Sequence, residues 1–359
     1  MPQLTDSLPD VAMPPGPVID PADWRGPEVL SRSDWLYTLD TEDIAALEAA
    51  EREVAKKGLE LTALSRADFP LGPLEHKVAA IRHQLIDGLG FVLLRGLPVE
   101  RYTHKQAATI YWGINLHLGK PVPANPDGHL LSHVINRGES LANVKQGGTY
   151  TNETLRYHVD ESDYVALLCL HPAKSGGAST LASAVAIHNA IRAERPDLLE
   201  LLYQPWYIDR RGNAQPAGAH PWYIMPVFTW HQGKLMTWVQ PQYTTSSQRF
   251  PEVPRYTDKQ WEAFNLVQEL ANDPRFRLDM TFGKGDIQVL NNHVILHSRT
   301  AYEDYPEPER KRHLLRIMTV APEVRALSPW HTGPDARTPG ARFEVFLGDK
   351  QPSIPIELD

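Results

Sequence analysis

The sequence predicts a mainly β protein with flanking helices, an α+β fold whose core is an antiparallel sandwich or barrel. Three observations favour this class. The chain contains 31 prolines in 359 residues, against roughly 18 expected from average usage, and prolines interrupt helices and central strands. Helical patterns lie outside or between runs of short apolar segments. The regular alternation of strands and helices that indicates a parallel sheet is absent, as is any internal repeat.

Helices are predicted where apolar residues recur at helical spacing after a capping residue. In the first of them, Asp40 or Thr41 caps the N-terminus, Leu47 and Val54 lie on one face, and Gly58 ends the helix. The predicted helices are 41–57, 73–87, 103–117, 185–195 and 257–270.

Strands are predicted from short apolar or alternating runs bounded by turn residues. The run Phe91–Leu94, followed by Gly96 and Pro98, is typical of a fully buried strand. In the last third of the chain the predicted strands are 286–291, 293–300 and 310–320.

The chain divides into three parts by composition. Residues 1–35 are rich in proline and aspartate, and we interpret them as an extended arm with Trp24 and Trp35 as anchors. Residues 36–325 form a single domain, and residues 326–359 form a tail without clear periodicity.

Composition excludes several classes of protein. The hydrophobic share of 42% and the charged share of 22% are those of a globular chain, and a net charge of −8 disfavours nucleic-acid binding. No apolar run approaches the roughly 20 residues that span a bilayer, and residues 1–20 lack a charged-then-apolar leader. The single cysteine, Cys169, fits a reducing compartment. We therefore expect a soluble cytoplasmic protein, without nucleotide-binding or serine-hydrolase motifs.

One short motif suggests metal chemistry. His158 and Asp160 form the only His-x-Asp triplet in the chain. In a strand, residues i and i+2 point to the same face, so this imidazole and carboxylate can bind one cation. The alternative is a simple hydrogen bond between the two side chains on a strand.

More histidines follow far along the chain. Residues 290–300 place His293 and His297 on one face of a predicted strand. Two histidines and one carboxylate are the ligand set of the non-haem iron(II) facial triad, which leaves positions open for a 2-oxo acid and dioxygen. A structural zinc site would instead be closed and rich in thiolate, and Cys169 alone cannot build one.

The next predicted strand carries two arginines on an otherwise apolar face. Arg312 and Arg316 share this face with Leu314, and a buried guanidinium requires an anion. A carboxylate matches the arginine fork, so an acidic co-ligand is indicated. The alternative is an internal Arg–Asp ion pair, for example with Asp286 or Asp304.

These segments resemble the taurine dioxygenase and 2,4-dichlorophenoxyacetate dioxygenase (TauD/TfdA-like) family of Fe(II)/2-oxoglutarate-dependent oxygenases. The resemblance runs from roughly Phe91 to Val320 and is carried by residues 157–160, 167–179, 285–292, 296–304 and 312–316. It implies a double-stranded β-helix, the cupin-like jelly roll, with helices packed outside. It also implies a dioxygenase that uses Fe(II), 2-oxoglutarate and O2 to hydroxylate or desaturate an unactivated C–H bond, releasing succinate and CO2.

The resemblance assigns roles to individual residues. It implies that His158, Asp160 and His297 bind iron, which leaves His293 to pack in the core or to support a metal ligand from behind. It implies that Arg316 binds the distal carboxylate of 2-oxoglutarate, with Arg312 in support.

Three further residues are implied near the co-substrate. Ser179 and Thr180 compete to supply a hydroxyl to its distal carboxylate, since strand alternation allows only one of them to face inward. Asn152 is a weaker candidate for contact with co-substrate or substrate. Because Asp160 retains its carboxylate, a halogenase variant of this chemistry is disfavoured.

The substrate is expected to be a small molecule that is anionic, amino-acid-like or a natural-product intermediate. Residues 204–223, between the metal motifs, are aromatic and basic, so Arg210 or Arg211 is a candidate for a substrate carboxylate. The alternative is that the tryptophans of this region, such as Trp206 and Trp222, are core residues.

Enzymes of this family are usually dimers or tetramers, so a homo-oligomer is expected. The arm and the tail, with Phe343, Val345 and Phe346, are candidates to embrace a second subunit. The residues alone leave two other functions open. One is a metal-dependent hydrolase or isomerase on a jelly-roll scaffold, in which Arg316 would lack a partner. The other is a non-catalytic ligand-binding sandwich.

Overall fold

The computed structural model describes residues 8–142, 147–211, 215, 218–333, 335–337, 342–343 and 347–357. Its largest sheet has seven strands in the order β1-β2-β13-β5-β16-β3, and β4 also pairs with β16. These strands are β1 (Leu36–Thr38), β2 (Phe91–Arg95), β3 (Lys120–Val122), β4 (Leu131–Ile135), β5 (Tyr164–His171), β13 (Ile287–Asn291) and β16 (His313–Val320). All of these pairings are antiparallel except that of β1 with β2, which is parallel.

A second, smaller sheet has the order β12-β7-β14. Its strands are β7 (Ser179–Ser183), β12 (Leu278–Met280) and β14 (Ile295–Arg299). Short two-stranded pairs complete the strands of the described residues: β6 (Ser175–Gly176) with β15 (Tyr302–Glu303), β8 (Tyr207–Asp209) with β9 (Trp222–Ile224), and β10 (Phe228–His231) with β11 (Lys234–Thr237).

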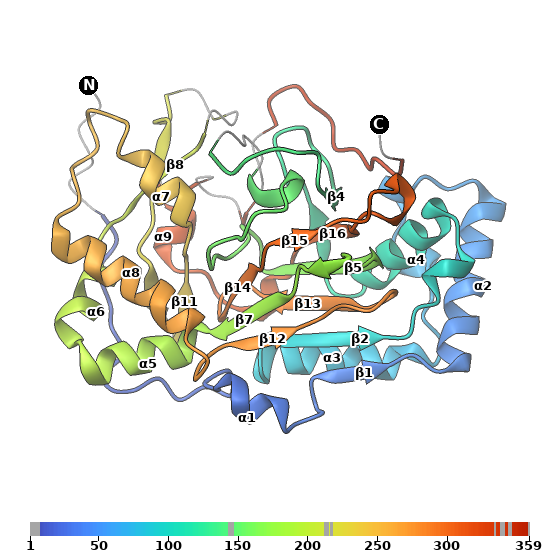
Figure 1. Ribbon diagram of the computed structural model, residues 1–359, viewed down its shortest axis with the longest axis horizontal. Coiled ribbons are helices and arrows are strands. Elements are labelled where there is room, and N and C mark those ends of the chain that lie inside the picture. The colour runs from blue at the N-terminus through green and yellow to red at the C-terminus, as the bar shows by residue number, and fades with distance from the viewer. Residues whose placement is uncertain are drawn as a thin grey trace.

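Helices flank the two sheets (Figure 1). The helices of the described residues are α1 (Gly26–Leu30), α2 (Thr41–Lys57), α3 (Leu74–Asp87), α4 (His104–Leu116), α5 (Ala184–Glu194), α6 (Pro196–Leu202), α7 (Pro241–Ser247), α8 (Asp258–Asn272) and α9 (Pro329–Thr332). In Figure 1, α2, α3 and α4 lie beside the large sheet, whereas α5, α6 and α8 lie at the β7 and β12 end.

The predicted helices and strands agree with the structure to within about three residues. Helix α2 is capped by Asp40, which accepts hydrogen bonds from the backbone N–H groups of Glu42 and Asp43, and it ends at Gly58 in the left-handed conformation. The sequence analysis missed the short helices α6, α7 and α9. They are four to seven residues long, too short to display a helical period.

The large sheet is buried on both faces. On one face, Leu168 of β5 and Val289 of β13 belong to a core shared with the helices, including Leu47 of α2. On the opposite face, Val165 and Cys169 of β5 belong to a second core with residues of the smaller sheet. Because side chains alternate along a strand, residues of β5, β13 and β16 are divided between these two cores. The second core is the one that surrounds the candidate site.

The N-terminal arm is packed against the body and is not extended throughout. It contains the helix α1, and the indole of Trp24 is buried and donates a hydrogen bond to the carbonyl of Leu89. Both Trp24 and Trp35 contact the ring of Phe91 in β2. The two predicted anchors therefore converge on one aromatic ring.

The C-terminal tail also returns to the body. Phe343 is buried and stacks on Trp238 with ring centroids 5.7 Å apart. The expectation that Phe343 embraces a second subunit is therefore wrong, because its ring packs within its own chain. Val345 and Phe346 lie outside the described residues.

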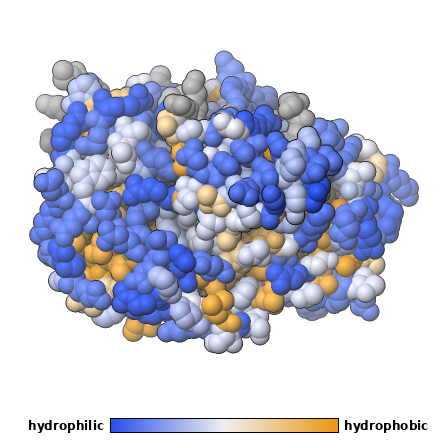
Figure 2. All heavy atoms as spheres, in the orientation of Figure 1, coloured by the Kyte–Doolittle hydropathy of each residue, from blue (hydrophilic) through white to orange (hydrophobic). Residues whose placement is uncertain are grey.

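The surface seen in Figure 2 is mostly hydrophilic, and its hydrophobic patches are small and separated. Among the described residues, the exposed large hydrophobic side chains are those of Leu8, Val11, Ile19 and Leu30, all in the N-terminal arm. Within the described part of the chain, no helix is long and apolar enough to cross a membrane.

Buried histidines are expected to make the stability of the metal-free protein depend on pH. Burial lowers the pKa of His188 to about 4 and the pKa values of His313 and His331 to about 3, whereas an unfolded histidine has a pKa of about 6.5. Below pH 6.5 the unfolded chain takes up protons that the folded chain does not. The free energy of unfolding should therefore decrease as the pH is lowered below 6.5, by about 1.4 kcal/mol per pH unit for each such histidine.

Urea unfolding of chelator-treated protein between pH 7.5 and pH 4.5 measures this dependence. We expect His188→Gln to make the curve less steep, and we expect no such change for His76→Gln, which alters an exposed residue of α3. A free energy of unfolding that is constant across this range would contradict the burial of neutral histidines.

Candidate active site

The two histidines predicted to bind metal face each other across a single backbone bridge. His158 and His297 form an isolated antiparallel β-bridge, in which each backbone N–H donates to the other carbonyl at 2.9 Å. Their rings lie 4.3 Å apart, between centroids. Two residues 139 positions apart are thus held side by side by the main chain.

Asp160 completes the cluster. One ligand atom from each of His158, Asp160 and His297 lies within 4.8 Å of the other two, and no other group of this kind occurs in the described part of the chain. The carboxylate Oδ2 of Asp160 is 3.7 Å from Nε2 of His297. The structure therefore brings together the three residues that the sequence analysis selected.

The local structure around these residues differs from the expectation in two ways. His158 and Asp160 lie in an extended loop before β5, not in a regular strand, because only His158 makes ladder hydrogen bonds. His293 lies in the turn before β14, so it does not share a strand face with His297. Its Nε2 instead bonds to Asp163 at 2.7 Å.

The protonation states suit metal binding. Burial lowers the pKa of His158, and burial together with the neighbouring His158 lowers the pKa of His297 to about 3. Burial alone would raise the pKa of Asp160, but Arg316 and the two histidines hold it below its usual value. At neutral pH the cluster thus offers two neutral imidazoles and one carboxylate, the forms that coordinate a metal.

The ring orientation of His158 is also fixed. Its Nδ1 lies 2.9 Å from the carbonyl of Arg156, which places the proton on Nδ1 and leaves the Nε2 lone pair for a ligand. The donor set of two imidazoles and one carboxylate fits iron(II) with open coordination positions.

The cluster opens onto a first cavity lined by three arginines. Arg299, Arg312 and Arg316 line it together with Ser179 and Leu314. Each of these arginines has a buried guanidinium nitrogen without a hydrogen-bond partner in the described structure: Nε of Arg299, Nη1 of Arg312 and Nε of Arg316. Burial lowers the pKa of Arg299 to about 10. Buried cationic donors without partners indicate a site built for an anion.

The two predicted arginines of the β16 region occupy different positions in this cavity. Nη1 of Arg316 is 3.4 Å from Oδ1 of Asp160, so its guanidinium lies beside the cluster. The guanidinium of Arg312 instead lies over the ring of Tyr302, 4.9 Å from the ring centroid. The alternative of an internal Arg–Asp pair is met in part. Arg316 pairs with Asp160, whereas Asp286 pairs with Arg95 and Asp304 accepts the backbone N–H of Arg312.

The hydroxyl residues are separated by strand alternation, as expected. Ser179 lines the first cavity, and its hydroxyl donates to Oε1 of Gln288 at 2.9 Å. Thr180 lines neither cavity of the site. Asn152 does not line them either, because its side chain donates to the carbonyl of Tyr302 at 3.1 Å. The structure thus brings Ser179 to the site and leaves Thr180 and Asn152 outside it.

A second cavity adjoins the cluster. Gly148, Leu155, His158, Asp160 and Arg316 line both cavities. The second alone is lined by polar side chains that the sequence analysis did not select: Glu161, Gln240, Gln242 and Tyr243. Of these four residues, only Glu161 had a feature in the sequence that could have identified it, because it directly follows the His-x-Asp triplet.

Arg210 and Arg211, the two candidates for a substrate carboxylate, differ in burial and position. Arg210 donates to the carbonyls of His220 and Ala336 and is 8% exposed, so it is a structural residue. Arg211 lines the second cavity. Trp206 and Trp222 are buried core residues, which confirms the alternative reading of these tryptophans.

Fold and site together define an iron(II)- and 2-oxoglutarate-dependent dioxygenase, and comparison with known proteins supports this class directly. Residues 57–318 match the model of the taurine catabolism dioxygenase TauD, TfdA family. The chain belongs to this family. It is an oxidoreductase that uses Fe(II), 2-oxoglutarate and O2 to oxidise a C–H bond of a small molecule, with release of succinate and CO2. The hydrolase and the non-catalytic sandwich are therefore set aside.

Two curated relatives are similar to this chain over most of its length. The chain is 34% identical over 312 residues to FR-33289 synthase of Streptomyces rubellomurinus (strain ATCC 31215), covering 84% of this chain and 89% of the relative. It is 29% identical over 323 residues to the taurine hydroxylase-like protein SAT17 of Stachybotrys chartarum (strain CBS 109288 / IBT 7711), covering 86% and 81%.

Solved structures of similar fold are iron oxygenases. Asparagine oxygenase in complex with Fe(II), 2S,3S-3-hydroxyasparagine and succinate aligns with a TM-score of 0.63 at 18% identity, covering 86% of this chain and 99% of that one. The non-heme iron oxygenase OrfP in complex with Fe and alpha-ketoglutaric acid aligns with a TM-score of 0.59 at 16% identity, covering 87% and 100%. These likenesses establish the fold.

Proposed function

We propose that His158, Asp160 and His297 bind the catalytic iron(II), that 2-oxoglutarate occupies the first cavity, and that the substrate enters the second. The observation that carries this proposal is the position of the cluster. His158 and Asp160 line both cavities, His297 lines the first, and the first cavity holds buried guanidinium nitrogens without hydrogen-bond partners among the described residues. A metal at this point contacts both reactants.

The bound iron supplies the activation of O2, coupled to the oxidative decarboxylation of 2-oxoglutarate to succinate and CO2. The chain's own residues bind and orient the reactants. The β-bridge between His158 and His297 fixes two ligands relative to each other, and Arg316 holds the Asp160 carboxylate in its ionised form. The largely buried cluster limits the access of water.

The two arginines divide the binding of 2-oxoglutarate between them. Two methylene groups separate the distal carboxylate from the chelating oxo group, so its anchor lies away from the metal ligands. Arg316, 3.4 Å from Asp160, is too close to the cluster for this role. Arg312 and Ser179 both line the first cavity and do not line the second. We therefore assign the distal carboxylate to Arg312 and Ser179, which exchanges the roles that the family resemblance implied for the two arginines.

Arg316 can then bind groups of the co-substrate and the substrate that lie close to the metal. It lines both cavities, so its guanidinium reaches the near carboxylate of 2-oxoglutarate on one side and an anionic substrate on the other. A guanidinium with several donors in one plane suits such a bridging position.

The architecture that fits this function is the double-stranded β-helix, or jelly roll. Two observations support it: residues of the seven-stranded and three-stranded sheets belong to one core, and the proposed ligands lie on β14 and in the loop before β5. We also propose a cytoplasmic homo-oligomer that binds neither nucleic acid nor membranes. A buried, unpaired Cys169 suits a reducing compartment.

The substrate class that the second cavity favours is a small anionic or amino-acid-like molecule. Arg211 and Arg316 offer positive charge, while Glu161 and the amides of Gln240 and Gln242 offer polar contacts. The names of related proteins agree with this class, since they include a taurine hydroxylase-like protein, uridine-5'-phosphate dioxygenases and an asparagine oxygenase.

A screen for substrate-stimulated succinate release tests this proposal. Small sulfonates, phosphates, amino acids and uncharged analogues of the same size are added to enzyme with Fe(II), 2-oxoglutarate and O2. We expect charged compounds to increase succinate formation, and we expect Arg211→Gln to raise the KM of the most active one with little change in basal succinate formation. Stimulation by the uncharged analogues alone would contradict the proposed substrate class.

A further inference from the structure

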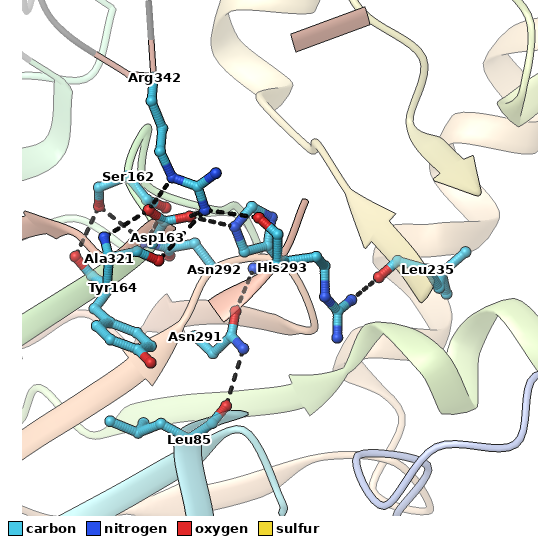
Figure 3. A network of polar contacts seen from close by, with 11 residues as sticks. Leu85, Ser162, Asp163, Tyr164, Leu235, Asn291, Asn292, His293, Ala321 and Arg342 are labelled. Carbon is cyan, nitrogen blue, oxygen red and sulfur yellow. Dashed lines mark hydrogen bonds and ion pairs between the residues drawn. The ribbon is translucent and has the colours of Figure 1, made fainter. Parts of the chain in front are cut away.

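An arginine from the C-terminal segment reaches the loop that carries the proposed metal ligands. Arg342 donates from Nε to Oδ2 of Asp163 at 2.7 Å and from Nη2 to Oδ1 at 2.6 Å. Asp163 is fully buried and stands three residues after Asp160. Figure 3 shows this bidentate pair at the centre of a network of polar contacts. Arg342 lies beyond residues 57–318, which match the family model.

The Asp163 carboxylate has two further partners. It accepts from Nε2 of His293 at 2.7 Å and from the backbone N–H of Ala321 at 2.8 Å. A buried carboxylate is stable only when charge and hydrogen bonds compensate its desolvation, and loss of one partner is costly. Arg342 supplies two of these four hydrogen bonds and a full positive charge.

Asn292 connects this pair to Asp160. Its backbone N–H donates to the carbonyl of Asp163 at 3.0 Å. Its side-chain Oδ1 accepts from the backbone N–H of Asp160 at 3.1 Å, and its Nδ2 donates to the carbonyl and hydroxyl of Ser162. The backbone from Asp160 to Asp163 is thus held as one unit, with Asn292 on one side and Arg342 at its end.

The same C-terminal segment makes a second contact with this loop. Arg337 pairs with Glu161 at 2.6 Å, and Glu161 also accepts a hydrogen bond from the hydroxyl of Tyr223. Phe343, next to Arg342, is buried against Trp238 and His293. Arg342 is therefore held in place by packing as well as by its charge.

We propose that Arg342 is a positioning residue for the metal site, acting through Asp163 and Asn292 on the backbone of Asp160. This inference rests on the proposed ligand set. Without Arg342 the loop retains its sequence but loses the ion pair that fixes its end. The carboxylate of Asp160 then samples orientations that do not meet the metal, so iron(II) binding weakens although no ligand has been removed.

The test compares Arg342→Met and Arg342→Lys with the wild-type enzyme. Loss of a group bonded directly to a metal ligand typically lowers metal affinity by about 10- to 100-fold. Arg342 acts on Asp160 through Asp163 and Asn292, so we expect an increase at the lower end of this range, about 10-fold, in the iron(II) dissociation constant of Arg342→Met, measured by anaerobic equilibrium dialysis. Arg342→Lys keeps the charge but cannot form the bidentate pair, so we expect an intermediate constant. The visible band of the complex with iron(II) and 2-oxoglutarate should shift or broaden in Arg342→Met.

Arg95→Met is the matched control, because Arg95 makes a similar bidentate pair with a buried carboxylate, Asp286, at 2.9 and 3.0 Å. We expect it to lower the thermal unfolding temperature with an unchanged iron(II) constant. If Arg342→Met and Arg342→Lys both bind iron(II) as the wild type does, the positioning role is overturned.

The variant His158→Ala distinguishes failure of the ligand assignment from failure of the role proposed for Arg342. If it loses iron(II) binding while the Arg342 variants keep it, the further inference fails alone. If His158→Ala itself binds iron(II) normally, the ligand assignment fails, and the role of Arg342 fails with it.

Discussion

Replacing His297 with alanine is expected to abolish the visible charge-transfer band that forms when iron(II) and 2-oxoglutarate are added to the enzyme without oxygen. The band requires both molecules on one metal. His297 supplies one of three protein ligands, and its partners His158 and Asp160 lie within 4.8 Å. Two remaining ligands do not hold iron(II) firmly enough to seat the co-substrate, so His158→Ala should have the same effect. Succinate formation in air should be lost in both variants.

His293→Ala is the matched control for this experiment. His293 is buried and stands four residues before His297, but its Nε2 bonds to Asp163 at 2.7 Å and does not reach the cluster. We therefore expect its removal to weaken the band without abolishing it. A band that survives in His297→Ala and disappears in His293→Ala would show that the metal ligands have been assigned wrongly.

The second large effect is expected for Arg312→Leu, which should raise the 2-oxoglutarate concentration needed for half-maximal succinate formation. Arg312 is 4% exposed and has an unpartnered Nη1 in the described structure. Truncating one partner of a buried, hydrogen-bonded charge pair costs about 2–5 kcal/mol, which corresponds to an increase of roughly 30-fold or more. Iron(II) binding measured without 2-oxoglutarate should remain near the wild-type value.

Arg316→Leu should behave differently, although it also changes an arginine on the same face. Arg316 contacts Asp160 at 3.4 Å and helps to keep that carboxylate ionised. Its loss should therefore weaken iron(II) binding and the response to substrate, as well as the binding of 2-oxoglutarate. If Arg316→Leu raises only the 2-oxoglutarate requirement and Arg312→Leu leaves it unchanged, the distal anchor is Arg316, as the family resemblance implied.

Local sequence signals were sufficient for the long elements of this fold. Asp40 and Gly58 mark the ends of α2 because a side-chain cap and a left-handed glycine act within a few residues. The same signals failed for the loop at His158. His158 in this loop is bridged to His297, a partner that local periodicity does not encode.

The candidate site was partly predictable for a related reason. Residue types and spacing selected His158 and Asp160 as candidates and left His293 and His297 as alternatives. The family resemblance then favoured His297. Spacing could not decide between Arg210 and Arg211, which are neighbours in the chain but differ in burial. Nor could it find Glu161 or Tyr243, whose side chains meet in the second cavity only after folding.

By itself, the sequence determined the class of chemistry and the order of the main helices and strands, and it predicted the metal ligand set through the family resemblance. Only the tertiary structure decided which hydroxyl faces the first cavity, how Arg312 and Arg316 are arranged around the cluster, and that Arg342 pairs with Asp163 across 179 residues of chain. The physical reason is the distance along the chain over which each property is set. Caps, periodicity and ligand types are properties of a few neighbouring residues, whereas burial and ion pairing depend on which distant segments pack together.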